Sequence, residues 1–406
     1  MQLCLGTVYA WSYFQKLLVD KPYGWSNAQV AGTFSSAICC LGLAAAWGGL
    51  NLPRFGPRRL TMIGGALFGA GHLLAALALY EKSLLLLYLG YGVIGGAGLG
   101  LAYVTPVATV AKWFPDKKGL MTGMVIMGFG FGALLMSKVF APLLFHACGG
   151  NLVAVFAWLG IGFLPTVVAL GAVLRNPPPG FAPSREHGTG SRESPSLLPA
   201  PCSPLPSPGL LSRQFAVMWL VFFVNIVAGI SLISFQSPLF QNLLHGRDPH
   251  LTSEVLAAYG ATLIAASSLF NGIGRITWGG ISDYIGRVRT FQLMLASQIV
   301  AFALLTQAGN PWLFGGLICY ILLCYGGGFG TMPSFVLDEF GPVKMPMVYG
   351  AILTAWSAGG IVGPQLVAFL NDHYANHVAR YVFLGNAAVL LLGLALTGLL
   401  GRPERR

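Results

Sequence analysis

The chain has 406 residues, of which 55% are hydrophobic and only 9% are charged, and its formal net charge is +11. Soluble globular chains carry about 25% charged residues, so this composition excludes an ordinary soluble enzyme, a disordered chain and a nucleic-acid-binding domain. Apolar segments of about 20 residues recur along the whole chain, which predicts an integral, multi-pass membrane protein.

Twelve apolar spans follow one another, and all but the first are long enough to cross a bilayer as a helix. The first reaches a charge at Lys16 and is a few residues short, as a truncated first helix would be. The spans predict an all-α membrane protein with twelve transmembrane helices. They cover residues 2–18, 28–50, 60–79, 84–110, 119–142, 152–174, 214–238, 255–279, 290–309, 312–336, 346–370 and 381–401.

A segment of different composition divides the spans into two sets of six. Residues 175–213 are dominated by Pro, Ser and Gly, so they cannot build a packed core, and we interpret them as a linker. We therefore expect a six-helix bundle over residues 1–174 and a second over residues 214–406, which ends in a short basic tail. Two parallel six-helix repeats are a transporter architecture, with the substrate site between them near the membrane midplane.

The basic residues are unevenly distributed between the predicted loops. If the spans alternate in direction, 16 of the 23 Lys and Arg lie on the side that also holds the linker and the C-terminus, and 5 lie on the other side. The two that remain, Lys138 and Arg275, fall within spans. Cytoplasmic loops are enriched in Lys and Arg, so we expect both termini in the cytoplasm. The positive charge then reflects topology and not a nucleic-acid partner.

A short motif occurs after the second span and again after the eighth. Residues 49–59 read GLNLPRFGPRR and residues 279–289 read GGISDYIGRVR, so each copy places two glycines seven residues apart around a basic turn. The second copy contains Asp283, and the first has Pro53 at the equivalent position. Each copy therefore combines a pair of glycines with charged residues. These residues are Gly49, Arg54, Gly56, Arg58, Gly279, Asp283, Gly286 and Arg287.

The second copy of this motif resembles the signature of the major facilitator superfamily. Longer strings at residues 3–14, 112–133, 326–335 and 353–364 resemble the oxalate/formate antiporter family within it, and the resemblance covers nearly the whole chain except the linker. It implies the major facilitator fold and alternating-access transport, with no enzymatic activity and no cofactor. It also implies a monomer in the bacterial inner membrane. In the superfamily the motif aspartate helps to close the cytoplasmic gate, so the resemblance makes the residues named above in both copies candidate gating residues. Pro53 leaves the contribution of the first copy in question.

Arg275 lies eight residues before Asp283, which is about 12 Å into the membrane at roughly 1.5 Å per residue. Such an arginine usually faces an interior cavity because its exposure to lipid is costly. The equivalent residue of the first repeat is Ala45, so the fold does not require arginine here. A guanidinium matches a carboxylate with two parallel hydrogen bonds. In the resembled family the arginine at this position binds the substrate carboxylate, although capping of helix carbonyls or pairing near the gate is a structural alternative.

The acidic residues and two neighbours of Arg275 refine this interpretation. All twelve Asp and Glu fall outside the predicted midplane, which disfavours organic-cation transport and an intramembrane proton relay. Asn271 lies one helical turn before Arg275, where related proton–monocarboxylate symporters commonly carry Asp. Trp356 lies where oxalate-exchanging members are expected to carry a lysine. A single buried cation suits a monoanion better than a dianion. Either residue could instead be purely structural.

Aromatic residues on the cavity-lining helices of this superfamily are further candidates, because a phenol combines an apolar wall with one hydrogen-bond donor. Gln236 is a weaker candidate, and Lys138 is expected near the external interface. The aromatic candidates are Tyr9, Trp11, Tyr13, Tyr103, Tyr320 and Tyr325.

The sequence therefore favours a secondary transporter of small carboxylate anions of the formate, pyruvate, lactate or oxalate class. We expect anion exchange, because an empty buried arginine resists the transition between states. A proton-coupled monocarboxylate symporter, a drug or sugar facilitator and a non-transporting sensor are the alternatives. His373 and His377 have the spacing of two metal ligands but fall in a predicted external loop, so we expect no metal site.

Overall fold

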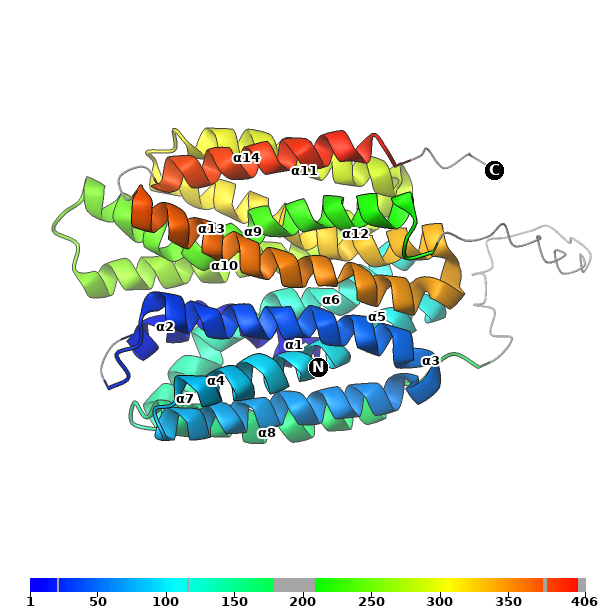
Figure 1. Ribbon diagram of the computed structural model, residues 1–406. Helices are drawn as coiled ribbons and strands as arrows, with labels where there is room; N and C mark the ends of the chain where they lie inside the picture. The colour runs from blue at the N-terminus through cyan, green and yellow to red at the C-terminus, as the bar shows by residue number, and fades with distance from the viewer. Residues whose placement is uncertain (20–21, 115–116, 179–208, 375–377, 401–406) are drawn as a thin grey trace, which may run out of the picture.

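The computed structural model describes residues 1–19, 22–114, 117–178, 209–374 and 378–400, and within these ranges the regular elements are all helices (Figure 1). Most of the predicted linker, residues 179–208, lies outside this description. The helical elements are α1 (Gln2–Leu5), η1 (Gly6–Ala10), α2 (Trp11–Val19), α3 (Asn27–Tyr80), α4 (Leu84–Leu87), η2 (Tyr88–Gly95), α5 (Gly96–Trp113), α6 (Lys118–Leu135), η3 (Met136–Phe140), α7 (Ala141–Ala147), α8 (Leu152–Ala172), α9 (Arg213–Arg247), α10 (Ser253–Ile285), α11 (Arg287–Leu305), α12 (Pro311–Ile352), α13 (Thr354–His373) and α14 (Val378–Thr397).

These elements make twelve membrane crossings. Nine helical stretches in the described part of the chain are long and apolar enough to cross a membrane. Two of them, residues 28–80 and 311–367, each contain two crossings that are joined by a kink. The first crossing is divided into α1, η1 and α2, so it does not count as one long helix. The predicted twelve-helix fold is confirmed.

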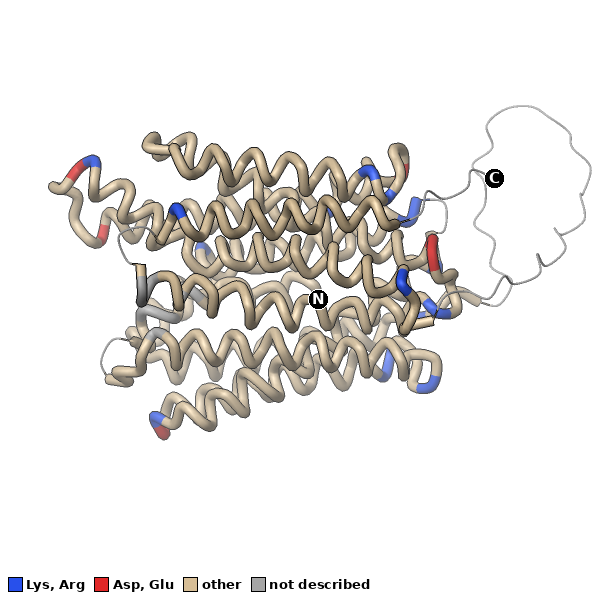
Figure 2. Tube along the Cα trace, turned by 45° about the horizontal axis from the view of Figure 1, so that its top comes forward, with Lys and Arg blue, Asp and Glu red and all other residues tan. Residues whose placement is uncertain are grey.

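Glycines make the sharp turns between consecutive crossings. Gly56 in α3, Gly286 after α10 and Gly341 in α12 have φ angles of 73°, 89° and 75°, a region that favours glycine. Figure 2 shows Lys and Arg gathered at the end of the bundle at which α14 ends. We call this end, which carries the turns at Gly56, Gly286 and Gly341, the basic end.

Side-chain hydrogen bonds cap the first turn of several helices and so fix the residue at which each helix begins. Ser26 and Gln29 form a reciprocal capping box at the start of α3. The other side chains that accept a hydrogen bond from the first turn of a helix are Ser83, Asn151, Ser212, Thr252 and Asn310.

The first six and the last six crossings meet along two seams that are built from small residues. In the α6–α10 seam, a Cβ atom on Gly279 would lie only 2.5 Å from the carbonyl oxygen of Gly119. In the α3–α12 seam, where α3 contacts α12 and α13, a Cβ on Gly49 would lie 2.1 Å from the carbonyl oxygen of Pro346. Larger residues could not be accommodated without moving a helix, so glycine permits the close approach.

The two seams repeat the same spacing. Gly119, Gly123 and Gly130 of α6 touch α10, and Pro346, Gly350 and Ser357 touch α3. In both sets the contacts fall four and then seven residues apart. Phe129 and Trp356 each precede the last contact by one residue, so they occupy equivalent positions in the two repeats.

Candidate anion-binding site

Arg275 lies in α10 at the α6–α10 seam, and its side chain is 0% exposed. Its Nε donates to Oδ1 of Asn271 at 3.3 Å, and its Nη1 donates to the carbonyl oxygen of Ile126 in α6 at 3.2 Å. Nη2 has no hydrogen-bond partner among the described residues. One buried, charged donor is therefore left to be satisfied by something else, since unpaired buried donors are costly.

Aromatic rings and not carboxylates surround this guanidinium. Its Cζ lies 5.2 Å from the ring centre of Phe129 and 4.9 Å from that of Phe329. Such contacts attract a cation without neutralising it. The ion pairs in the described part of the chain do not include Arg275. The centre of the bundle therefore carries one uncompensated positive charge.

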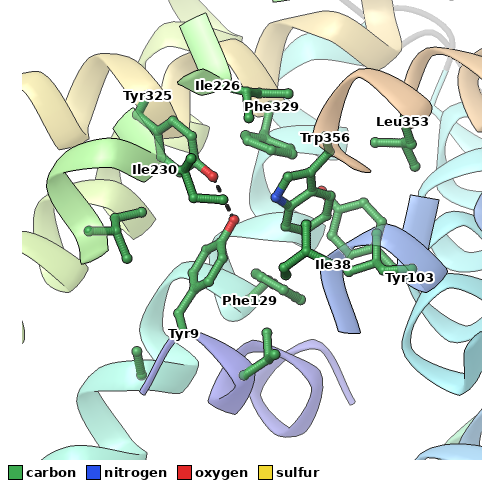
Figure 3. Packing of buried hydrophobic residues seen from close by; sticks show 14 of the residues in the cluster. Tyr9, Ile38, Tyr103, Phe129, Ile226, Ile230, Tyr325, Phe329, Leu353 and Trp356 are labelled. Carbon is green, nitrogen blue, oxygen red and sulfur yellow. Dashed lines mark hydrogen bonds between the residues drawn. The ribbon is translucent and has the colours of Figure 1, made fainter. Parts of the chain in front are cut away.

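Figure 3 shows an aromatic cluster from both halves, which includes the two phenylalanines that contact the arginine. The Trp356 ring is 5.5 Å from Phe129, 5.3 Å from Tyr103 and 6.0 Å from Tyr9 between ring centres. The hydroxyls of Tyr9 and Tyr325 are hydrogen-bonded at 2.7 Å, which joins the first crossing to α12. The side chains of Tyr103, Tyr325 and Trp356 are 0% exposed, so the site is closed to both ends of the bundle.

Several donors in this cluster make no well-formed hydrogen bond to another described residue. They are the hydroxyls of Tyr103 and Tyr349 and the indole Nε1–H of Trp356, in addition to Nη2 of Arg275. Both tyrosines lie close enough to Arg275 for electrostatic interaction. Indole and guanidinium nitrogens can donate hydrogen bonds but cannot accept them or ligate a metal. The arrangement can therefore bind an anionic group with several acceptor oxygens, such as a carboxylate.

Two of the helices that supply this cluster are irregular at the site. Tyr9 lies in η1, a short 3₁₀ segment between α1 and α2. The eleventh crossing is interrupted at Leu353, between α12 and α13, three residues before Trp356. Interrupted helices near the centre of the bundle are typical of transporter binding sites, because they allow local rearrangement.

Most of the predicted site residues lie together. Asn271, Tyr9, Tyr103, Tyr325 and Trp356 gather around Arg275, through the hydrogen bonds and ring contacts described above.

Other candidates lie elsewhere. Tyr13 is half-buried and its ring contacts that of the adjacent Phe14, and the buried Trp11 packs on Tyr91 within the first six crossings. Lys138 is exposed and donates to Thr262.

Sequence reasoning missed Phe129, Phe329 and Tyr349. A phenylalanine or tyrosine within an apolar span gives no individual signal of function. Phe129 occupies the position in the first repeat that is equivalent to the predicted Trp356. This equivalence follows from the contacts between helices, so the sequence alone could not reveal it.

The second copy of the turn motif forms an ion-pair cluster at the basic end, made of Lys118, Asp283, Arg287 and Asp338. Asp283 accepts hydrogen bonds from the backbone N–H groups of Gly119 and Leu120, both at 3.1 Å. These groups belong to the first turn of α6, where the helix dipole favours an anion. Arg287 lies 2.7 Å from Asp283 and 2.8 Å from Asp338, which also pairs with Lys118 at 3.0 Å. The cluster therefore ties α6 to α10 and α12.

The first copy of the motif is built differently. Gly49 makes the close contact with Pro346, and Gly56 makes the turn, but Pro53 offers no charge. Arg54 lies over the ring of Phe55 at 5.6 Å, and Arg58 is exposed. Neither arginine belongs to an ion pair within the described residues. The first copy therefore contributes close packing to the α3–α12 seam but no counterpart of the Asp283 ion pair.

Glu339 is a further titratable group at the basic end, next to Asp338. It accepts a hydrogen bond from Nε2 of Gln214 at the start of α9. Partial burial and then the charge of Asp338 raise the pKa of the Glu339 carboxyl above its ordinary value, while the bond from Gln214 acts in the opposite direction.

Known proteins share this architecture and parts of this sequence. The chain is 27% identical over 413 residues to the oxalate:formate antiporter of Oxalobacter formigenes, covering 100% of this chain and 91% of that protein. It is 27% identical over 492 residues to apicoplast pyruvate carrier 1 of Toxoplasma gondii, covering 98% and 86% of the two chains. The crystal structure of FucP in the outward conformation superposes with a TM-score of 0.65 at 16% identity, covering 99% and 98%, and so shows the same fold. A sequence model described as Major Facilitator Superfamily matches residues 3–364. The chain therefore belongs to the Major Facilitator Superfamily, a family of membrane transporters and not of enzymes, and it resembles the oxalate:formate antiporter within that family.

Proposed function

We propose that this transporter carries small monocarboxylate anions, of the formate, pyruvate and lactate class, by exchange. The observation that carries the proposal is the fully buried guanidinium of Arg275, which has an unpaired Nη2 and no acidic partner among the described residues. A carboxylate would satisfy Nη2 and neutralise the charge at once. The names of the two relatives reported above describe small carboxylates, of which formate and pyruvate are monocarboxylates and oxalate is a dicarboxylate.

The number of charges favours a monoanion over oxalate. One guanidinium neutralises one carboxylate, and the second carboxylate of a dianion would meet Trp356, Phe129 and Phe329, which carry no charge. A buried charge without a partner is strongly unfavourable. Exchange follows from the same argument, because the empty site must move with its own charge uncompensated.

Alternating access would proceed by opening and closing the two seams around Arg275. In the described structure both seams are in contact at the basic end, through Gly49 with Pro346 and through Asp283 with the first turn of α6. We propose that this end faces the cytoplasm, since it carries the excess of Lys and Arg.

Counterflow in proteoliposomes tests the substrate and the mode of transport. Vesicles loaded with unlabelled formate, pyruvate, lactate or oxalate are diluted into the labelled anion, and uptake is compared with uptake into empty vesicles. We expect monoanion exchange to exceed oxalate exchange at least about tenfold, in line with the cost of an unpaired buried charge. Net uptake into empty vesicles that is as fast as exchange would contradict the exchange mode.

Variants of Arg275 test the site itself. Arg275→Ala should abolish counterflow, and Arg275→Lys should retain less than about a tenth of it, because lysine lacks the planar pair of donors. The exposed Arg59→Gln is the matched control and should transport normally. A drug or sugar facilitator would tolerate Arg275→Ala, and a sensor would bind the anion without moving it.

A proton symporter is the second candidate, and it would alkalinise the external medium during uptake. Asn271 occupies the position beside Arg275 where such a transporter needs a proton-accepting group, and an amide cannot take that role. We therefore expect no pH change that depends on substrate.

A further inference from the structure

A groove of about 330 Å³ lies on the outer surface of the bundle, between α11 and α14. Figure 1 shows these two helices side by side at one edge of the molecule, away from the seams. The groove is lined by Arg289, Gln292, Leu293, Ala296 and Leu394. None of these residues takes part in the anion site or in the ion-pair cluster described above.

The α11 side of the groove is graded from charged to apolar. Arg289, Leu293 and Ala296 are spaced by four and three residues, so they share one face of the helix. At about 1.5 Å per residue, Ala296 lies roughly 10 Å deeper in the membrane than Arg289. Arg289 is in the first turn of α11, at the basic end, and Leu293 is 53% exposed. The lining therefore changes from a cation at headgroup depth to bare apolar surface at acyl-chain depth.

Arg289 is available for a ligand. It is exposed, and in the described part of the chain it has no ion pair and no hydrogen bond from its side chain, unlike Arg287 two residues earlier. A guanidinium binds phosphate with two parallel hydrogen bonds. A basic residue at the mouth of a groove between transmembrane helices is the arrangement that recognises anionic lipid headgroups.

We propose that the groove between α11 and α14 binds one anionic phospholipid from the leaflet at the basic end. The phosphate would contact Arg289, and an acyl chain would lie along Leu293, Ala296 and Leu394. Charge complementarity favours this occupant over a zwitterionic lipid: both carry a phosphate, but the headgroup cation of the zwitterion cancels its charge and is repelled by the guanidinium. The proposal requires the membrane-embedded fold but not the identity of the transported anion.

Native mass spectrometry of the full chain, released from detergent micelles, tests this proposal. Phosphatidylglycerol and phosphatidylcholine with identical acyl chains are titrated separately, and the first bound lipid is quantified. We expect phosphatidylglycerol to bind about fivefold more tightly, which corresponds to ~1 kcal/mol for one cationic side chain at a membrane surface. Arg289→Gln should remove this preference, and the exposed Arg59→Gln should keep it.

Two further arms locate the lipid. Ala296→Phe fills the apolar part of the groove and should weaken binding of both lipids, while monodisperse elution of the variant checks its fold. Glycerol 3-phosphate, a headgroup without acyl chains, should not displace the lipid. The proposal fails if Arg289→Gln retains the preference or if Arg59→Gln loses it equally. It also fails if glycerol 3-phosphate competes as well as the lipid does.

Discussion

The α6–α10 seam and the α3–α12 seam have the same spacing of small residues, but their chemistry differs. The first contains Arg275 at the centre and Asp283 at the basic end, and the second has Ala45 and Pro53 at the equivalent positions. The difference extends to the partner helix. Gly119 donates its backbone N–H to Asp283, whereas its counterpart Pro346 has no N–H to donate. The α3–α12 seam thus lacks the acceptor and one of the two donors, while Met347, the counterpart of Leu120, does carry an N–H.

Both seams keep the geometry of the interface, and only the α6–α10 seam carries the buried charge. Close helix packing needs only small residues, so both seams retain it. Charge recognition needs a buried cation with partners, which is costly, and one copy suffices.

The glycines that contact Arg275 and Ala45 provide a matched pair of substitutions. A Cβ on Gly123 would lie 2.3 Å from the carbonyl oxygen of Arg275, and one on Gly350 would lie 2.4 Å from that of Ala45. Overpacking costs about 1–3 kcal/mol in either seam, so Gly123→Ala and Gly350→Ala should destabilise the protein similarly. Only Gly123→Ala displaces the arginine, so its dissociation constant for a monocarboxylate should rise about tenfold or more. Equal losses of affinity in calorimetry would contradict the division between seams.

Removal of the Asp283 charge should promote opening at the basic end by a comparable or larger factor. Asp283→Asn weakens two charge-assisted hydrogen bonds and one ion pair, together about 1.5–3 kcal/mol, so opening should become about 10- to 150-fold more populated. The alkylation rate of a cysteine placed at Ser334, in a background without other cysteines, measures this opening. Ser334 is buried at the seam and hydrogen-bonds to Thr122 of α6.

The reciprocal substitution is the control for that experiment. Pro53→Asp places an aspartate in the α3–α12 seam, but Pro346 offers it no N–H. We therefore expect less than about a twofold change in the alkylation rate, since an exposed unpaired charge contributes little. A strong suppression of alkylation would mean that the acceptor alone accounts for the difference between the seams.

Lys118→Gln should have a smaller effect than Asp283→Asn. The side chains of Lys118 and Asp338 are 28% and 36% exposed, and such ion pairs contribute about 0–1 kcal/mol. Opening should therefore increase by about fivefold at most, and the difference should vanish in 1 M salt. The exposed Lys117→Gln controls for general loss of positive charge, and an undiminished effect at high salt would exclude an ion-pair origin.

The smallest expected effect is that of Glu339 ionisation on stability. Its pKa is raised in the folded protein, so the native state binds more protons than the unfolded state just above the ordinary value of 4.5. Stability should then fall as pH rises through that window. Glu339→Gln should raise the apparent thermal midpoint by a few degrees at pH 7 and not at pH 4, where the carboxyl is protonated in both states. An equal gain at both pH values would point to packing instead of ionisation.

The twelve crossings and the central arginine could be predicted because each depends on local sequence. Apolar length marks a crossing, and the count from Asp283 places Arg275 in depth. The cluster of Tyr9, Tyr103 and Tyr325 followed from the helices that line the cavity in the resembled family. Tyr13 does not join them, because the direction of a side chain depends on how the helix is rotated, which length and hydropathy do not encode.

Other features depend on contacts between distant segments. Phe129 and Phe329 flank the guanidinium, but the chain has 26 phenylalanines and none is distinguished by its neighbours in sequence. Leu353 is neither glycine nor proline, so the residue type gives no signal of the interruption at this position. The ion pair between Lys118 and Asp338 joins residues 220 positions apart, so only the folded arrangement reveals it.

The hydrogen bond between the phenols of Tyr9 and Tyr325 has a consequence for the transport cycle. It joins the first crossing to α12 at the closed centre of the bundle, so the two halves cannot separate there without breaking it. Each hydroxyl must then be solvated, by water or by cargo oxygens. Hydration of the core and movement of the two halves are therefore coupled. An osmolyte that lowers water activity outside should slow turnover even when the substrate is saturating.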